Sequence, residues 1–402
     1  MSRGSRRKAW FSVGFSILAI CILLLALPFL FKVSYSNVLG TNETDLGLGT
    51  TTPVFVATHV ETPEAVKGIY VTACVAGTPS WRENLKKLIE TTELNSVVID
   101  IKDYSGTISF LDSDFPQANV SGCRVADMKE FVEELHESNI YVIGRITVFQ
   151  DPFYTKLHPE LAVKKKSDGG VWKDHKGLAF IDVGAKPYWD YIIDLSKKSY
   201  ALGFDELNFD YIRYPSDGNM KDTNYTWTPK QSEDATGQAT YMTKHEVLRS
   251  FFAYLHDSLK EVDVKTSADL FGMTTTNNDD LGIGQVLEDT LEYFDFVDPM
   301  VYPSHYPPTW NGFKNPAEHP YEVIKLSMQG GIDKEQALQV SLGIATSTPS
   351  KLRPWLQDFD MGASYGVAEV QAQIKATYDI GLVSWLIWDA GNKYTTGAFL
   401  AE

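Results

Sequence analysis

The residues best suited to chemistry in this chain are carboxylates on or at the end of short alternating segments. The segment GFDELNFDYIRYPSDG (203–218) alternates Leu207 and Phe209 with Asn208 and Asp210 before a Tyr-Pro pair. Such alternation predicts a β-strand, and proline ends it. Asp210 therefore stands where a strand ends, close to Arg213. An Asp in this position either caps the following loop or, in a parallel α/β barrel, belongs to the catalytic end of the strands.

Further polar residues fall on strand faces that a barrel would bury. They are Asp100 and Lys102 in VVIDIKD, Arg145 in the next strand, Ser267 and Asp269 in TSADLFG, Asp298 and Tyr302 in VDPMVYPSHY, and Trp388 with Asp389 in SWLIWDAG. Burying many ionisable groups is costly unless they pair or serve a purpose. Asp100 with Lys102 or Arg145 could form a purely structural ion-pair network. Catalysis is the alternative for part of this set.

Paired carboxylates among aromatic rings are suited to cleaving glycosidic bonds. One carboxyl protonates the leaving oxygen, and the other attacks or stabilises the anomeric carbon. Aromatic residues near expected strand ends and loops are Trp172, Trp227, Tyr302, Tyr306, Trp310 and Trp388. Each could be ordinary packing, but together they favour a sugar ligand. A separation of about 5–5.5 Å between the carboxyl groups would indicate retention of configuration, and about 6.5–9.5 Å inversion.

Other chemistries have less support in the sequence. The eight histidines include no His-x-His or His-Glu-x-x-His spacing, and there is no P-loop, so we expect no metal and no cofactor. His305, in PSHYPP, either contacts substrate or is a solvated loop residue. The formal net charge of −16 argues against nucleic acid as a partner, because a phosphate backbone would be repelled.

The first part of the chain predicts a membrane anchor. Basic residues in 1–9 precede an uncharged apolar run over 10–31, long enough to span a bilayer. We expect residues 1–9 in the cytoplasm, a signal-anchor helix over 10–31, a flexible linker over 32–65 and an extracytoplasmic domain over 66–402. A cleaved signal peptide, giving a secreted protein, is the alternative. Cys74 and Cys123 would then form a disulfide or remain as two thiols.

After residue 66, strand-like and helix-like segments alternate. We expect strands over 67–75, 96–102, 141–149, 206–214, 264–271, 296–302, 339–345 and 383–389, and helices over 81–92, 125–138, 188–202, 244–262 and 368–380. Eight strands with intervening helices predict an α/β protein with a closed (β/α)8 TIM barrel. A doubly wound open sheet is disfavoured, because no G-x-G-x-x-G spacing follows the first strand.

Several strings resemble the putative glycosyl hydrolase domain family, whose members are barrel glycosidases distantly related to α-amylase-like enzymes. They are GIYVTA, VVIDIKDYSG, HPELAVKKKSDGGVWKDHKGLAFIDV, GFDELNFDYIRYPSDG, SADLFG, DPMVYPSHY and SWLIWDAG, within about residues 68–391. The resemblance implies a barrel glycoside hydrolase acting on an extracellular or cell-wall polysaccharide. It implies Asp210 as nucleophile and Asp269 as acid/base, where amylase-like enzymes have Glu, with Asp298 as the competing acid/base. Asn208 replaces the Arg that those enzymes carry two residues before the nucleophile.

Two functions follow from this reading. In the first, an anchored hydrolase cleaves the polysaccharide and further residues bind the sugar: Asp100, Lys102, Arg145, Asn208, Arg213, Tyr302, His305, Trp388 and Asp389. In the second, a catalytically inactive barrel binds glycan as a cell-surface adhesin or wall tether. The second needs the aromatic rings but not two opposed carboxylates.

Overall fold

The computed structural model describes residues 57–119, 122–234, 236–345 and 349–401. The expected anchor over 10–31 and most of the expected linker lie outside these residues. Of the helices in the described ranges, none combines the length and apolar character that a bilayer span requires.

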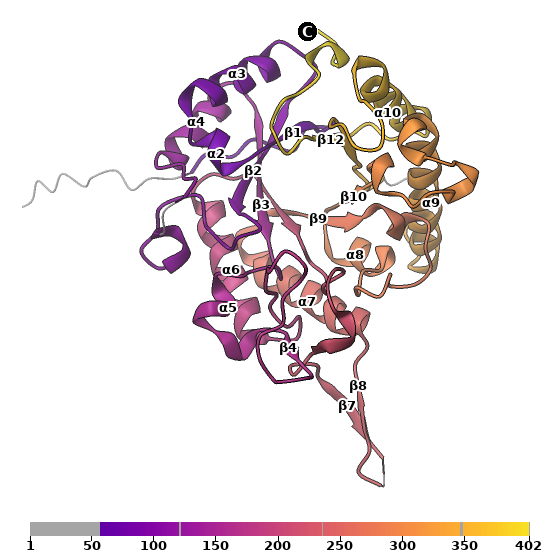
Figure 1. The fold of residues 1–402 in the computed structure, drawn as a ribbon. Helices are drawn as coiled ribbons and strands as arrows, with labels where there is room; N and C mark the ends of the chain where they lie inside the picture. The colour runs from indigo at the N-terminus through magenta and orange to yellow at the C-terminus, as the bar shows by residue number, and fades with distance from the viewer. Residues whose placement is uncertain (1–56, 120–121, 235, 346–348, 402) are drawn as a thin grey trace, which may run out of the picture. The chain divides into compact units, whose positions relative to one another are not determined.

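Eight parallel strands close into a barrel, as the alternation predicted (Figure 1). They are β1 (Lys67–Val71), β2 (Ser96–Lys102), β3 (Tyr141–Thr147), β5 (Glu206–Asp210), β9 (Lys265–Phe271), β10 (Phe296–Met300), β11 (Trp355–Gln357) and β12 (Trp385–Trp388). Their order around the barrel is β1-β12-β11-β10-β9-β5-β3-β2. The barrel closes where β1 pairs with β12, with Gly68 opposite Leu386.

Helices surround the strands on the outside (Figure 1). They are α2 (Ala73–Ala76), α3 (Pro79–Glu90), α4 (Met128–Glu137), α5 (Tyr154–Leu157), α6 (Lys186–Ala201), α7 (Lys244–Leu259), α8 (Leu287–Tyr293), α9 (Pro320–Ser341) and α10 (Val367–Asp379). Two small antiparallel pairs lie outside the barrel: β4 (Lys164–Lys165) with β6 (Thr223–Asn224), and β7 (Lys230–Glu233) with β8 (Ala239–Tyr241). The β7–β8 hairpin projects away from the barrel in Figure 1.

Strand β5 shows how the sequence alternation positions the site. Leu207 and Phe209 are fully buried in the large apolar cluster between strands and helices. Asn208 and Asp210 alternate with them and therefore face the barrel interior. The strand ends at Asp210 because Tyr211 has a φ of +52°, a left-handed conformation that breaks the β geometry. The expected strand over 206–214 is therefore four residues too long.

The expected seventh strand over 339–345 is wrong. Residues 320–341 form α9, and the seventh barrel strand is β11, only three residues long. Val340, Leu342 and Ile344, which alternate along this range, are 67%, 54% and 46% exposed, so they face solvent rather than a core. β11 escaped prediction because three residues after a proline are too few to show a period.

The amino-terminal residues of the described domain contact the barrel. The Val60 N–H donates to Oδ1 of Asp205 at 2.7 Å, and Nδ1 of His59 lies 3.6 Å from the same oxygen. The Thr62 hydroxyl lies 3.1 Å from the Tyr141 hydroxyl. Part of the stretch expected as linker thus packs at the end of the barrel where β3 and β5 begin.

Cys74 and Cys123 are joined by a disulfide, with a Cα–Cα distance of 4.4 Å. This settles the choice between a bridge and two thiols. The bridge connects α2, which follows β1, to the long connection after β2.

Candidate active site

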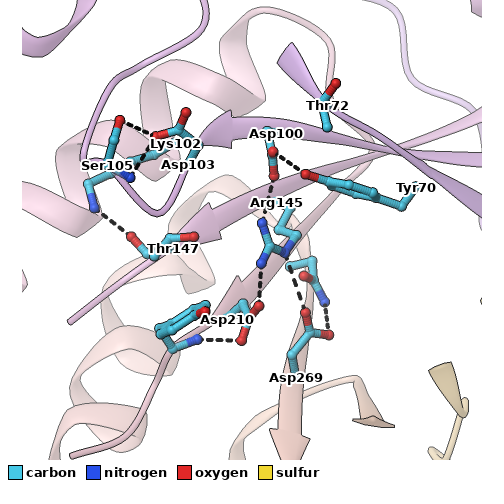
Figure 2. Close-up of polar contacts among 12 residues, drawn as sticks. Tyr70, Thr72, Asp100, Lys102, Asp103, Ser105, Arg145, Thr147, Asp210 and Asp269 are labelled. Atoms are coloured by element: carbon cyan, nitrogen blue, oxygen red, sulfur yellow. Dashed lines mark hydrogen bonds and ion pairs between the residues drawn. The ribbon is translucent and has the colours of Figure 1, made fainter. Parts of the chain in front are cut away.

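Arg145 of β3 lies at the centre of the carboxyl ends of the strands and contacts three carboxylates (Figure 2). One terminal nitrogen donates to Oδ1 of Asp100 at 2.7 Å, and the other donates to Oδ2 of Asp210. Its Nε lies 3.7 Å from Oδ2 of Asp269. Acidic groups from β2, β5 and β9 therefore meet around one guanidinium.

Asp210 is positioned by the turn that follows it. The backbone N–H of Tyr211 donates to Oδ1 of Asp210 at 2.5 Å, while Oδ2 faces Arg145. A non-glycine residue at positive φ costs free energy, and such residues cluster at functional sites. The left-handed Tyr211 ends the strand and turns its N–H onto the carboxylate.

Asp269 has a different environment. Its Oδ1 accepts from Nδ2 of Asn208 at 2.9 Å and from Nε1 of Trp355 at 2.7 Å. Burial, together with the negative charges of Asp210 and Asp298, raises the pKa of Asp269 well above its usual range, although Arg145 opposes this shift. A proton on this carboxyl belongs on Oδ2, because Oδ1 already accepts two N–H groups. This is the protonation state that a general acid needs.

Asp298 is fully buried and pairs with Arg353. Its Oδ1 accepts from Nε of Arg353 at 2.9 Å, and its Oδ2 accepts from a terminal nitrogen at 2.8 Å. Arg353 also pairs with Glu206 at 2.5 Å. Burial raises the pKa of Asp298 to about 6, although Arg353 opposes this. Two cavities lie at the barrel mouth; Asp298 lines neither of them, whereas Asp269 lines one.

Tyr70 and Trp388 form an aromatic wall beside Arg145. The two rings stack with centroids 3.8 Å apart, and Arg145 lies 5.1 Å from the Trp388 centroid. The Tyr70 hydroxyl donates to Oδ2 of Asp100 at 2.5 Å. Asp100 therefore accepts hydrogen bonds from both Tyr70 and Arg145, and it helps to position the Arg145 guanidinium.

Two cavities open at the barrel mouth. One has a volume of about 590 Å³ and is lined by Asp210, Asp269 and the rings of Tyr302 and Tyr306, among others. The other, of about 930 Å³, lies over Asp100 and is bordered by Trp81 and the disulfide. Both are lined by Arg145, Tyr211, Arg213 and Trp388. The cavities therefore adjoin and form an elongated cleft across the strand ends.

Arg213 lies in both cavities and pairs with no carboxylate within the described part of the chain. Its guanidinium lies 4.8 Å from the Tyr211 ring centroid and 4.9 Å from that of Phe271. One nitrogen donates to the Tyr214 carbonyl at 3.0 Å. Burial lowers the pKa of Arg213. Its remaining N–H groups are available to an acceptor on a ligand.

Comparison with known proteins gives a family. The model of the putative glycosyl hydrolase domain matches residues 68–394, which includes every strand of the barrel except the first residue of β1. The chain belongs to the putative glycosyl hydrolase domain family. This confirms the resemblance and identifies the protein as a glycoside hydrolase. No curated protein matches the chain.

Two solved structures with TM-scores above 0.5 share the fold of this glycosyl hydrolase domain. The glycoside hydrolase domain of PgaB (BpsB) from Bordetella bronchiseptica is 14% identical, with a TM-score of 0.55 over 81% of this chain and 94% of that one. The α-L-fucosidase isoenzyme 2 from Paenibacillus thiaminolyticus is 10% identical, with a TM-score of 0.52 over 84% of this chain and 47% of that one. A hypothetical protein from Ruminiclostridium thermocellum ATCC 27405 is 31% identical, with a TM-score of 0.42, over 54% of this chain and 98% of that one.

Most residues expected at the site line the cleft of the glycosyl hydrolase domain. Asp100, Arg145, Asp210, Arg213, Asp269, Tyr302, His305 and Trp388 line one or both cavities. Asn208 lies just beneath and holds Asp269 and Asp298. Burial lowers the pKa of His305, so its ring is neutral near pH 7.

Lys102 and Asp389 do not line the cleft. The β2–β3 register shifts between Asp100 and Lys102, so strict alternation fails there. Nζ of Lys102 instead donates to the Thr147 carbonyl at 2.6 Å (Figure 2). It also lies 2.9 Å from Asp151. Oδ1 of Asp389 accepts from the backbone N–H of Lys393 and so stabilises the turn after β12.

The residues at or below the site that were not predicted include Tyr70, Glu206, Arg353 and Trp355. Tyr70 alternates in β1 with Ile69 and Val71, which face the outer apolar cluster, so its inward position was readable from the period of that strand. Glu206 shares the face of Asn208 and Asp210 for the same reason. Arg353 and Trp355 were missed because the seventh strand was misplaced.

One serine-hydrolase motif in the sequence lies apart from this site. The G-x-S-x-G string GASYG (362–366) is in the loop before α10, and Ser364 is exposed. Within the described ranges Ser364 makes no hydrogen bond to a histidine, so it lacks the base that a serine nucleophile needs. In the same ranges no group of three or more His, Cys, Asp and Glu residues could hold a metal ion.

Proposed function

We propose that this domain hydrolyses glycosidic bonds within an extracellular or cell-wall polysaccharide, with Asp210 as nucleophile and Asp269 as general acid/base. The observation that carries the proposal is that both carboxyls line one cavity but have unlike environments. Asp210 is paired with Arg145, whereas burial and neighbouring negative charge raise the pKa of Asp269. Two carboxyls whose environments differ in this way can act as nucleophile and acid.

The proposed reaction has two steps. Asp210 forms a bond to the anomeric carbon as the bond to the leaving oxygen breaks, and the Oδ2 proton of Asp269 passes to that oxygen. In the second step water attacks the anomeric carbon and gives a proton to Asp269, and the bond to Asp210 breaks. The anomeric configuration is retained, because two inversions occur at the same carbon.

Arg145 accounts for the departure from the amylase-like pattern at Asn208. Arg145 and Asn208 are opposite one another in the β3–β5 ladder. A guanidinium from the neighbouring strand therefore reaches Asp210, which the resemblance would have supplied with an Arg two residues earlier in the same strand. We infer that Arg145 takes over that role.

The shape of the cleft supports cleavage inside a chain rather than at its end. The two adjoining cavities extend on both sides of Arg145, so sugar units can bind on either side of the broken bond. Trp388 and Tyr302 provide apolar ring faces for sugar rings. Arg213 provides N–H donors to a substrate oxygen.

We further propose that residues 10–31 anchor the enzyme in the cell membrane by a single span, with the barrel outside the cytoplasm. The Cys74–Cys123 disulfide supports this location, because structural disulfides persist mainly in oxidising compartments.

The test is release of reducing ends from a panel of insoluble and soluble polysaccharides. We expect Asp210→Asn to abolish release without unfolding the barrel, because the nucleophile is lost while the side-chain shape is kept and Arg145 keeps its pairing with Asp100. Asp333→Asn makes the same change on the exposed face of α9 and should leave release unaffected.

Two results would contradict the proposal. Turnover by Asp210→Asn at the wild-type rate would exclude Asp210 as the nucleophile. Glycan binding by both proteins, with no product from any substrate of the panel, would instead indicate an inactive glycan-binding barrel.

A further inference from the structure

The described part of the chain buries four cationic side chains, those of Lys102, Arg145, Arg213 and Arg353. Lys102, Arg145 and Arg353 each pair with at least one carboxylate. Arg213 pairs with none of the carboxylates that the structure describes. Buried charges are normally paired, because taking an isolated ion out of water is costly. Arg213 therefore differs from the other buried cations in lacking an anion.

The Arg213 guanidinium can be reached from the cleft. The residue is 8% exposed and lines both cavities. Nη1 donates to the Tyr214 carbonyl at 3.0 Å, whereas Nε and Nη2 have no partner among the described residues. Neither of these two nitrogens is completely closed off from solvent. Together they present the edge of the guanidinium that binds both oxygens of a planar carboxylate.

Aromatic rings hold this guanidinium where the two cavities meet. It lies 4.8 Å from the ring centroid of Tyr211, 4.9 Å from that of Phe271 and 5.9 Å from that of Phe180. Phe271 lines the smaller cavity, and Phe180 lines the larger one. Tyr211 directly follows Asp210, so the cation is close to the carboxyl proposed as nucleophile. The rings attract the cation but supply no negative charge that could pair with it.

Two carboxylates act on Arg213 from a distance and are engaged elsewhere. Burial lowers the pKa of Arg213, although Tyr211, Asp210 and Asp174 oppose this shift. Asp210 pairs with Arg145. Oδ1 of Asp174 accepts from the backbone N–H groups of residues 176 and 178, at 2.9 and 2.8 Å. These carboxylates therefore leave the free edge of the guanidinium open to an anion on a ligand.

The smaller cavity has an excess of positive charge. Its charged side chains are those of Arg145, Asp210, Arg213 and Asp269. Burial and neighbouring negative charge raise the pKa of Asp269, so two cations face one anion there when Asp269 is protonated. The larger cavity has three cationic side chains but four acidic ones, those of Asp100, Asp103, Asp174 and Asp217. An anionic group on a ligand is therefore favoured in the smaller cavity.

We propose that Arg213 binds a carboxylate of the sugar unit in the smaller cavity, so that the polysaccharide cleaved here contains acidic sugars. This rests on the hydrolysis proposed above, because it names the substrate class of the same cleft. Nε and Nη2 each donate to one carboxylate oxygen, and the anion compensates for the desolvation of the guanidinium. Since the whole chain has a formal net charge of −16, recognition depends on this local contact rather than on long-range attraction.

Binding of matched tetrasaccharide pairs tests the proposal and distinguishes the two sources of a sugar carboxylate. For hexuronates, the pairs are tetragalacturonate, tetraglucuronate and tetramannuronate, each with its carboxyl-reduced form. For the lactyl group of muramic acid, the pair is the alternating N-acetylglucosamine and N-acetylmuramic acid tetrasaccharide with tetra-N-acetylchitotetraose. We expect calorimetric titration to give a Kd at least about tenfold lower for the acidic member of at least one pair.

The titrated protein is the full chain with Asp269→Asn. This change slows cleavage by removing the proposed acid. It also keeps the charge of the smaller cavity, because a neutral amide replaces a protonated carboxyl. Asp210→Asn is unsuitable for this experiment, because it removes a negative charge and would itself favour an anionic ligand.

Arg213→Met, added to this protein, separates charge recognition from a structural role. It removes the guanidinium and keeps an unbranched side chain between the rings. We expect the ratio of the two Kd values in the preferred pair to fall to about one, because the contact with the carboxylate is lost. A purely structural role would raise both Kd values by the same factor. Arg249→Met makes the same change at an exposed site and should leave both values unchanged.

The proposal is overturned if no acidic tetrasaccharide binds more tightly than its counterpart while Arg213 is present, a comparison that does not require Arg213→Met to fold. An unchanged ratio in folded Arg213→Met would also overturn it. Either result leaves hydrolysis of neutral polysaccharides standing. Conversely, an Arg213-dependent preference for acidic sugars, with no product from any polysaccharide, would contradict only the hydrolase mechanism.

Discussion

Arg145 shows how a single cation can give several carboxylates different environments. It donates hydrogen bonds to Asp100 and Asp210 but only approaches Asp269, at 3.7 Å through Nε. The partners of Asp269 are instead the neutral donors Asn208 and Trp355. A neutral donor opposes protonation less than a cation does, so burial dominates and the pKa of Asp269 rises.

Trp355→Phe tests this account of Asp269. The change removes an N–H that stabilises the ionised carboxyl, so the pKa of Asp269 should rise further. Because the acid must be protonated, activity is lost as pH rises through that pKa. We therefore expect the basic limb of the kcat/KM profile to move to higher pH.

Trp385→Phe is the matched control for this experiment. Nε1 of Trp385 donates to the Tyr378 hydroxyl, so its loss should leave the profile in place. A basic limb that does not move in Trp355→Phe would exclude Asp269 as the acid.

At the scale of elements, a buried ion-pair network joins β5, β10 and the residues before β11. Arg353 precedes β11 and pairs with Glu206 and with Asp298, and all three side chains are almost completely buried. A charge taken out of water is tolerated when it is paired. When one partner is removed, the remaining buried charges keep the free-energy cost of desolvation without the compensating attraction. The network therefore links three strands beneath the cleft.

We expect Arg353→Met to lower the free energy of unfolding by about 3–5 kcal/mol, as for breaking a buried ion pair. The loss should be larger at pH 8 than at pH 5. Arg353 opposes the upward shift in the pKa of Asp298, so without Arg353 that pKa rises further in the folded state, and the free-energy cost of ionising Asp298 grows as pH rises. Urea unfolding at the two pH values measures it.

Arg249→Met is the comparison, because Arg249 pairs with Asp289 and Glu292 at an exposed site. Its effect should stay below about 1 kcal/mol. A similarly small, pH-independent effect of Arg353→Met would show that the buried network contributes little.

The elements also show what the sequence could predict. Long alternating strands such as β5 were readable because one face is apolar and the other carries Asn208 and Asp210. β11 was not readable, because Trp355–Gln357 is too short to show a period. Since this strand was not predicted, neither Trp355 nor Arg353 was placed near the site. Lys102 was misassigned because a register shift reverses the face of a strand without leaving a mark in the sequence.

At the scale of the whole molecule, the described domain begins before the first strand. His59 and Val60 contact Asp205, whose other oxygen accepts from the Val142 N–H at 2.7 Å and from Nε2 of His136 at 3.1 Å. Asp205 is buried, so these contacts compensate for its desolvation.

We expect a chain of residues 56–402 to keep the activity and the melting temperature of the full chain but to lose its association with membranes. A chain of residues 66–402 should be less stable by about 1.5–3 kcal/mol, because the Val60 hydrogen bond to a charged group is lost. Membrane fractionation and thermal unfolding of the three proteins measure these effects.

Recovery of the 56–402 protein in the membrane fraction would contradict the proposed anchor. Equal stability of the 56–402 and 66–402 proteins would show that the contacts with Asp205 are not needed for folding.

The stacked rings of Tyr70 and Trp388 come from the first and last strands of the barrel, 318 positions apart in the chain. The aromatic platform beside Arg145 therefore cannot form until the ribosome has added Trp388, after the other seven barrel strands have been synthesised. A chain that stops before the last strand lacks one of the two stacked rings, however much of its secondary structure has formed.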